Sequence, residues 1–158
     1  MSVEIVKEYL KALGVADRVQ EFDVSSATVE LAAKALDTEC ARIAKSITLY
    51  QKDGACLMLV AAGDVKIDNA KFKSTFCQKA RMMSHEDALA ATGHAVGGIC
   101  PFALPDGVSV YLDSSLKRFD TVYPAAGSAS SAVELTCDEL FCASRAIAWV
   151  DVCKSYDA

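Results

Sequence analysis

The sequence predicts one α/β domain of the mixed α+β kind, in which helices surround a curved mixed β-sheet or barrel. The chain has 158 residues, 53% of them hydrophobic and 23% charged, which suits a single domain with a sizeable core. Segments with helical spacing of apolar residues alternate with short β-branched segments. Residues 55–62, ACLMLVAA, carry no charge, which is typical of a central strand covered on both faces.

Helices are predicted where apolar residues recur every three or four positions and capping residues mark the ends. The longer predicted helices, in chain order, are 3–13 before Gly14, 29–36 after Thr28, 69–76 after Asp68, 84–93 between Ser84 and Gly93, and one after Thr136, which forms a capping box with Glu139. Shorter helical turns are expected just before Ile43 and at 116–119.

Strands are predicted where β-branched and apolar residues lie between turn residues. In chain order these are 18–22, 44–50, 55–62, 108–113, 121–124, 132–135 and 146–152. The Asp53-Gly54 step is expected to join the second and third as a hairpin. Residues 94–107 contain three glycines and two prolines and are predicted to form the longest loop, whereas 125–131 form a second loop of small residues.

Charge is unevenly distributed along the chain. The net charge of −5 argues against a general nucleic-acid coat, and we expect neither DNA nor a membrane as a partner. Residues 41–81 nevertheless hold eight cations and three anions. Such a basic segment suits local contact with a phosphate backbone, although a solvated helix face would have the same composition.

The cysteines and the first residues favour a cytoplasmic protein with reduced thiols. The chain has seven cysteines, an odd number, and no CxxC pair. Most are expected to act as small core residues. The N-terminus has no basic region followed by an apolar run, and no segment approaches the roughly 20 apolar residues of a membrane span. With two histidines and no ligand spacing, neither a metal site nor a cofactor is expected.

Three features could carry chemistry. Lys45 shares a strand face with Ile47 and Leu49, where a desolvated amine could stabilise a developing oxyanion, unless it reaches water from a sheet edge. Gly97 and Gly98 could present backbone N–H groups to a ligand, or form a plain tight turn. Cys100 with His94 would suit a thiol hydrolase only if the fold brought them together.

Several segments in one order resemble the YbaK/prolyl-tRNA editing domain family, whose members are aminoacyl-tRNA deacylases. The resemblance covers nearly all of residues 1–158, as one domain. It is carried by SSATVELAAKALDTECARIAKSITLY, VAAGDVKIDNAKF, ATGHAVGGICPF, VYLDSSLKRFDTVYPAAG, SSAVELTCDEL and AWVDV. It implies an α/β domain that hydrolyses the ester of a mischarged tRNA in trans, without a metal or cofactor. The implied partners are aminoacyl-tRNA and prolyl-tRNA synthetase, and the implied substrate is a small amino acid on tRNAPro.

The resemblance also assigns site residues. The essential lysine of the family corresponds to Lys45, which is therefore the expected catalytic residue. The expected substrate-binding residues lie in the two loops and are Gly97, Gly98, Ile99, Cys100, Pro101, Gly127 and Ser128. Cysteinyl-specific relatives have an aspartate where this chain has Ala132, so the resemblance leaves the amino acid open. Cys100 is expected to line the pocket and not to act as a nucleophile.

Two alternatives to the deacylase remain at this point. A non-catalytic module would use the same groove to hold tRNA or a synthetase, but it would have no need of Lys45. A thiol redox protein or thiol hydrolase would depend on Cys100, and its activity would be lost in Cys100→Ala.

Overall fold

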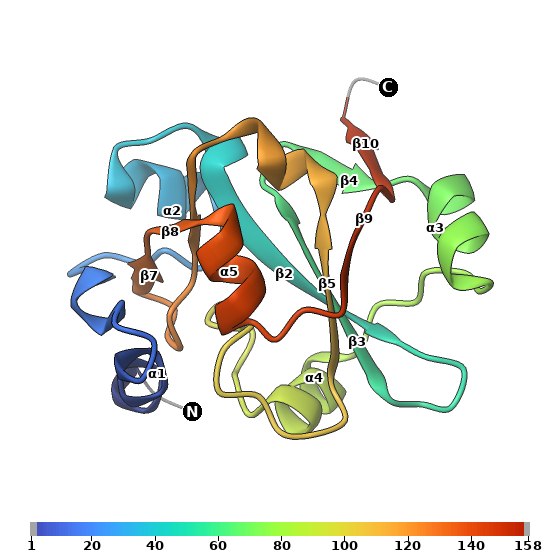
Figure 1. Ribbon diagram of the computed structural model, residues 1–158, viewed down its shortest axis with the longest axis horizontal. Coiled ribbons are helices and arrows are strands. Elements are labelled where there is room, and N and C mark those ends of the chain that lie inside the picture. The colour runs from blue at the N-terminus through green and yellow to red at the C-terminus, as the bar shows by residue number, and fades with distance from the viewer. Residues whose placement is uncertain (1–2, 157–158) are drawn as a thin grey trace.

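A curled six-stranded sheet organises the molecule and carries helices on both faces (Figure 1). The computed structural model describes residues 3–156. The helices are α1 (Val3–Lys11), α2 (Val29–Leu36), α3 (Asn69–Phe76), α4 (His85–Thr92) and α5 (Cys137–Ala143). The strands are β1 (Val19–Glu21), β2 (Ile43–Tyr50), β3 (Cys56–Ala62), β4 (Val65–Ile67), β5 (Ser109–Asp113), β6 (Thr121–Pro124), β7 (Ser131–Val133), β8 (Leu135–Thr136), β9 (Ala148–Val150) and β10 (Cys153–Ser155).

The main sheet has the strand order β8-β6-β2-β3-β5-β9 and contains both parallel and antiparallel pairs. β2 and β3 form the antiparallel hairpin predicted from the sequence, while β5 joins β3 and β9 joins β5 in parallel. All seven residues of β3 are buried, which confirms its central position. The mixed α/β fold class is therefore confirmed.

The helices begin and end largely where their capping residues predict. Thr28, Asp68 and Ser84 accept hydrogen bonds from the first turns of α2, α3 and α4. Thr136 and Glu139 form the predicted capping box of α5. α3 covers one face of the sheet through an edge-on contact of Phe76 with Tyr111, 4.9 Å between ring centroids. α5 covers the other face, where Phe141 stacks on Trp149.

Two predicted strands are wrong in their extent. The predicted strand 132–135 is broken at Glu134: β7 pairs with β1, whereas β8 pairs with β6. The predicted strand 146–152 ends at Val150, and β10 follows it as a separate strand that pairs with β4. The cause in both cases is a change of partner strand, which a run of apolar residues does not reveal.

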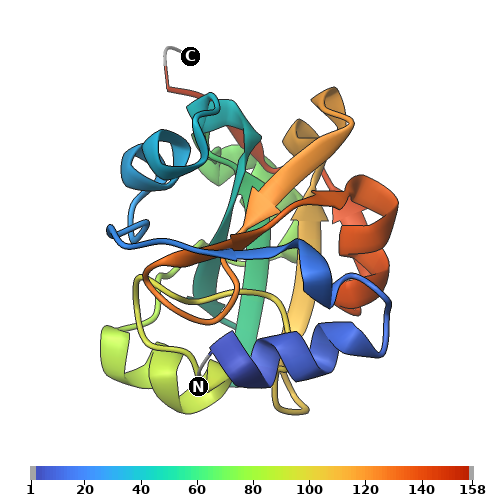
Figure 2. The ribbon, with the colours of Figure 1, turned by 90° about the vertical axis from the view of Figure 1, so that its left-hand side faces the viewer.

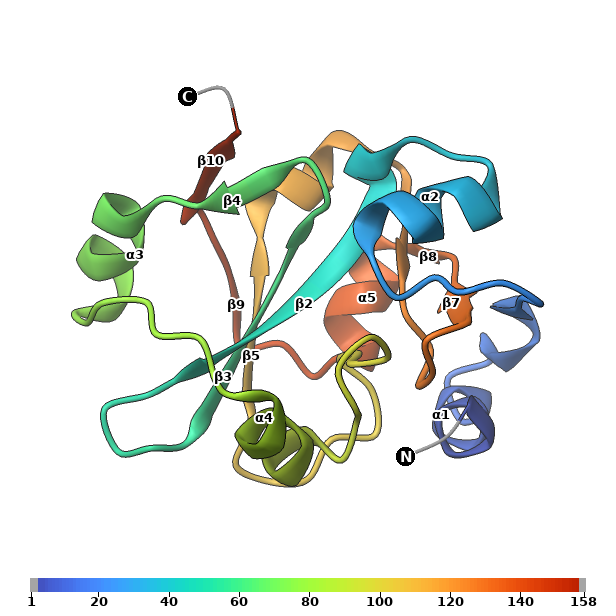
Figure 3. The same ribbon diagram turned by 180° about the vertical axis from the view of Figure 1, so that it is seen from behind.

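Figure 2 shows the side of the molecule that holds α1, α2 and α4. Figure 3 shows the antiparallel pair of β4 and β10, called the β4–β10 ribbon below, beside α3. Most cysteines contact the hydrophobic core, as expected, since Cys40 and Cys137 are partly buried and pack against it. Cys56, Cys100 and Cys153 are buried, but Cys77 and Cys142 are exposed.

No helix within residues 3–156 has both the length and the apolar character needed to cross a membrane.

Candidate functional site

A hollow lies beside the edge of β2, where the neighbouring strand leaves the sheet. β6 pairs with β2 only at Ile43↔Tyr123 and Ala44↔Pro124. Pro124 has no N–H to extend the ladder, so the two strands separate beyond it. The hollow has a volume of about 230 Å³ and is closed on its other sides by α2 and by the loops 94–107 and 125–131. We call it the Lys45–Gly97 hollow.

Small and hydroxyl-bearing residues form most of this hollow, and no acidic residue lines it. Its lining consists of Ser26, Ala27, Thr28, Val29, Ala32, Ile43, Ala44, Lys45, Ser46, Val96, Gly97, Ile99, Tyr123, Ala125, Ser131 and Ala132. The hydroxyl oxygens of Ser26 and Ser46 are buried and have no hydrogen-bond partner within residues 3–156. Buried polar atoms without partners are uncommon in folded proteins. The lining therefore has unused hydrogen-bonding capacity that suits a small polar ligand.

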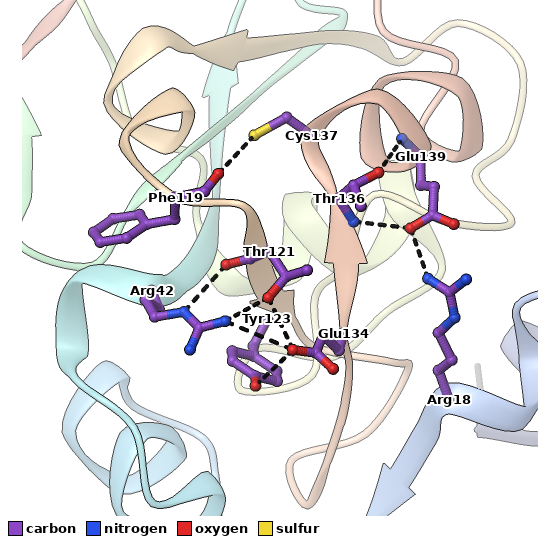
Figure 4. A network of polar contacts seen from close by, with 9 residues as sticks. All are labelled: Arg18, Arg42, Phe119, Thr121, Tyr123, Glu134, Thr136, Cys137 and Glu139. Carbon is purple, nitrogen blue, oxygen red and sulfur yellow. Dashed lines mark hydrogen bonds and ion pairs between the residues drawn. The ribbon is translucent and has the colours of Figure 1, made fainter.

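A network of polar contacts holds the Tyr123 side of the hollow (Figure 4). The Tyr123 hydroxyl donates to Glu134 at 2.9 Å, and Thr121 donates to the same carboxylate oxygen at 2.8 Å. Arg42 binds the Thr121 carbonyl and hydroxyl, and its guanidinium lies 5.0 Å from the centre of the Tyr123 ring. Hydrogen bonds from Thr121 and Tyr123 lower the pKa of Glu134. The residue that breaks the predicted strand 132–135 thus anchors this wall.

Lys45 lies at the border between this hollow and a second one. Its amine donates to the Val65 carbonyl and, at 3.3 Å, to the Tyr156 hydroxyl. Both acceptors belong to the β4–β10 side of the molecule. An ammonium has three donors, so these two acceptors leave one donor of Lys45 unused. The predicted alternation of side chains along β2 is also observed, since Lys45 and Ile47 both line the second hollow.

The glycine pair shapes the wall of the hollow. Gly98 N–H donates to the Ala95 carbonyl at 3.0 Å, and Gly97 has φ +97°, as the third residue of a type II turn requires. A Cβ on Gly98 would lie 2.8 Å from the backbone of Ser128, so the two loops touch at this residue. Gly97 N–H has no partner within the described part of the chain. Of the two predicted amides, only that of Gly97 is uncommitted.

The structure therefore brings some of the predicted site residues together and separates others. Lys45, Gly97 and Ile99 line the hollow. Gly98 and Ser128 support it through their mutual contact. Cys100, Pro101 and Gly127 are buried and do not line it. Sequence reasoning missed Val65, Tyr123 and Tyr156, because nothing in the local pattern indicates that they approach Lys45 or the hollow.

Cys100 and His94 are adjacent but inaccessible. The Cys100 sulfur lies 3.5 Å from His94 Nε2, and both residues are fully buried. Burial raises the pKa of the Cys100 thiol to about 12 and lowers the pKa of His94. A thiolate is the reactive form of cysteine, so this pair does not supply a nucleophile near pH 7. Among residues 3–156, no group of three His, Cys, Asp or Glu side chains is placed to hold a metal ion.

Comparison with known proteins identifies the family. The aminoacyl-tRNA editing domain family matches residues 23–141. The chain belongs to this family. The YwhH protein of Bacillus subtilis strain 168, which is uncharacterized, is 47% identical over 157 residues, covering 99% of this chain and 100% of its own.

Solved structures also resemble this editing domain. A candidate trans-editing enzyme for prolyl-tRNA synthetase superimposes with a TM-score of 0.86 at 25% identity, covering 97% of each chain. The hypothetical protein APE2540 superimposes with a TM-score of 0.84 at 26% identity, covering 95% of this chain and 99% of its own. The fold of the chain is thus that of YbaK-like editing domains.

Proposed function

We propose that this editing domain is a trans-acting deacylase that hydrolyses the ester between a small amino acid and a mischarged tRNA, with tRNAPro as the first candidate. The observation that carries the proposal is the Lys45–Gly97 hollow. It combines a lysine, an uncommitted amide and buried hydroxyls in a space of about 230 Å³. The similarity to a candidate trans-editing enzyme for prolyl-tRNA synthetase supports the choice of tRNA.

In the proposed reaction, water attacks the ester carbonyl carbon and the bond to the terminal ribose oxygen breaks. The proton released by the water passes to the ribose oxygen, which leaves free amino acid and free tRNA. The third donor of Lys45 and the Gly97 N–H bind the carbonyl oxygen as it becomes negative. Losing one such donor typically costs about a hundred- to a thousand-fold in rate.

The hydroxyls of Ser26 and Ser46 are assigned to the α-amino group of the substrate. The hollow has no acidic residue, so neutral oxygen atoms must accept hydrogen bonds from that ammonium. The volume of the hollow, about 230 Å³, limits the size of the amino acid. When two side chains differ by one methylene, exclusion of this kind changes the free energy that discriminates between them by about 1 to 3 kcal/mol.

The test is deacylation of tRNAPro charged in turn with cysteine, alanine, serine and proline. Wild-type protein is expected to remove at least one ester, and Lys45→Ala is expected to lose at least about a hundred-fold in rate. Lys11→Ala, which removes an exposed lysine of α1 outside the basic segment 41–81, is the matched control and should retain the wild-type rate.

Circular dichroism and the thermal midpoint establish that Lys45→Ala is folded. A folded Lys45→Ala variant with the wild-type rate would contradict the assigned role of Lys45. If every ester survives while the protein binds tRNA, the chain is a non-catalytic binding module. If it neither cleaves nor binds tRNAPro, the tRNA assignment is wrong.

A further inference from the structure

A second hollow of about 440 Å³ lies on the β4–β10 side of Lys45. It is open to solvent and is lined by Lys45, Ile47, Lys66, Ile67, Asn69, Ala80, Met82 and Tyr156. We call it the Tyr156 hollow. No acidic residue lines it, whereas two lysines and an exposed aromatic ring do.

Two lysines face each other across the ribbon next to this hollow. Lys66 of β4 and Lys154 of β10 are direct cross-strand partners. Like charges in this position repel each other and destabilise a strand pair. Neither amine, nor that of Lys45, forms an ion pair within residues 3–156. An anion bound between the amines would remove this repulsion.

The acidic residue that Lys154 influences is already committed to another role. The pKa of Asp68 is lowered first by the hydrogen bond from the Lys71 N–H, and also by the charge of Lys154. The same carboxylate oxygen accepts from the Ala70 N–H, so Asp68 serves as the N-terminal cap of α3. Lys66 and Lys154 therefore have no acidic ion-pair partner within residues 3–156 and are available to an anionic ligand.

Tyr156 provides a flat apolar surface beside these amines. The residue is 60% exposed, and its ring centre lies 5.3 Å from the Lys45 amine and 5.8 Å from the Lys66 amine. Met82, 66% exposed, lies in the same hollow. An exposed ring with adjacent cations is the arrangement by which proteins bind unpaired nucleotides, since the base stacks and the amines neutralise phosphate.

Another lysine lies beside an aromatic ring elsewhere in the molecule, but acidic residues accompany it. The Lys117 amine lies 4.5 Å from the centre of the Trp149 ring, but Asp120 and Asp138 line the same surface. An anion would be repelled there. The Trp149 surface therefore serves as an internal control for a cation beside an aromatic ring.

We propose that the Tyr156 hollow binds the unpaired 3′-terminal nucleotides of the tRNA, with a base stacked on Tyr156 and phosphates held by Lys66 and Lys154. This proposal rests on the proposed function. Lys45 lines both hollows, so a terminal nucleotide held at Tyr156 lies next to the Lys45–Gly97 hollow, where its ester would react.

The test measures binding by fluorescence anisotropy, without any chemical step. The probes are a labelled acceptor-stem RNA hairpin with a single-stranded CCA end and the same hairpin with a blunt end. Wild type should bind the first more tightly. Tyr156→Ala should weaken that binding about five- to a hundred-and-fifty-fold, the typical effect of losing one stacked base, while Tyr156→Phe should keep it within about twofold.

Salt dependence tests the lysines. Each lost phosphate contact should reduce the slope of log K against log salt by about 0.7 in a single strand, so Lys66→Ala and Lys154→Ala should each show this change. Lys117→Ala should leave both affinity and slope unchanged. Equal binding of the blunt hairpin, equal losses in Tyr156→Phe and Tyr156→Ala, or a Lys117→Ala effect as large as that of Lys66→Ala would overturn the proposal.

These outcomes are separable from failure of the proposed function. If the esters are hydrolysed but Tyr156→Ala binds the CCA hairpin normally, the function stands and this site is wrong. If no ester is hydrolysed but binding depends on Tyr156, the nucleotide site stands and the deacylase proposal is wrong.

Discussion

The two hollows that meet at Lys45 differ in chemistry. The Lys45–Gly97 hollow is the smaller, at about 230 Å³, and small apolar and hydroxyl-bearing residues close it from several elements. The Tyr156 hollow, at about 440 Å³, is open and carries two lysines and an exposed tyrosine. A small hollow walled on several sides can discriminate by size, whereas a more open, charged hollow binds with little dependence on detailed shape.

Under the two proposals, the hollows bind different parts of one substrate. The aminoacyl group must be selected by its size, whereas the 3′ end of the tRNA must be attracted and oriented. Variants of the first hollow should therefore change hydrolysis without changing RNA binding. Variants at Gly98, Ala125 and Cys100 test this separation.

The largest effect is expected where the two loops touch. Gly98→Ala places a Cβ 2.8 Å from the Ser128 backbone, so one loop must move. We expect a loss of about 1 to 3 kcal/mol in the free energy of unfolding, typical of overpacking, and at least a tenfold loss of kcat/KM. Urea denaturation and deacylation measure the two effects.

The matched control for this change is Gly107→Ala in the same loop. A Cβ there would meet nothing within 4 Å, although φ is +97°, so only backbone strain is added. It should retain activity, and Gly98→Ala should still bind the CCA hairpin. Wild-type kcat/KM in Gly98→Ala would show that the loop contact does not shape the hollow.

Narrowing the hollow is expected to change activity alone, whereas Gly98→Ala also lowers stability. Ala125→Leu adds three carbon atoms to a half-buried lining residue. For the ester that wild type removes, kcat/KM should fall about 10- to 200-fold. The fall should be smallest for the alanyl ester, because added bulk excludes larger side chains first. Steady-state kinetics over the ester panel provide the measurement.

Ala90→Leu, on the exposed surface of α4, is the control for added bulk and should behave as wild type. An equal loss for all esters in Ala125→Leu would mean that size is not selected at this wall. A loss of CCA-hairpin affinity in the same variant would break the separation between the two hollows.

The smallest effect on rate is expected from Cys100→Ala. The thiol is fully buried, its pKa is raised to about 12 by burial, and it lines neither hollow. We expect kcat within about twofold of wild type and a loss of stability of about 1 kcal/mol from the small cavity. Abolished deacylation in a folded variant would restore the thiol-hydrolase alternative.

Local signals predicted much of the fold, because they act through neighbours in the sequence. Thr28, Asp68, Ser84 and Thr136 cap helices through bonds that span two or three residues. The unbroken apolar run of β3 predicted its central place, since such a strand must be covered on both faces. The partners of β7 and β10 were not predictable, because strand pairing depends on distant residues.

The candidate site was predicted in part for the same reason. Lys45 was singled out by alternation along its own strand, and the glycines by their conformational freedom. The burial of Cys100 depends on how the loop folds back onto the core. Tyr156 lies 111 residues from Lys45, and only the pairing of β10 with β4 brings its hydroxyl to the amine.

The helices, the central strand and the family resemblance followed from the sequence, as did the expectation of a role for Lys45, because periodicity, capping and motif order are properties of the chain. Three properties depend on the tertiary structure: Gly98 joins two loops, Cys100 is buried, and Lys45 lies between a small hollow and a more open, basic one. These properties arise from contacts between residues far apart in sequence, which form only when the sheet curls and its edge strands find their partners.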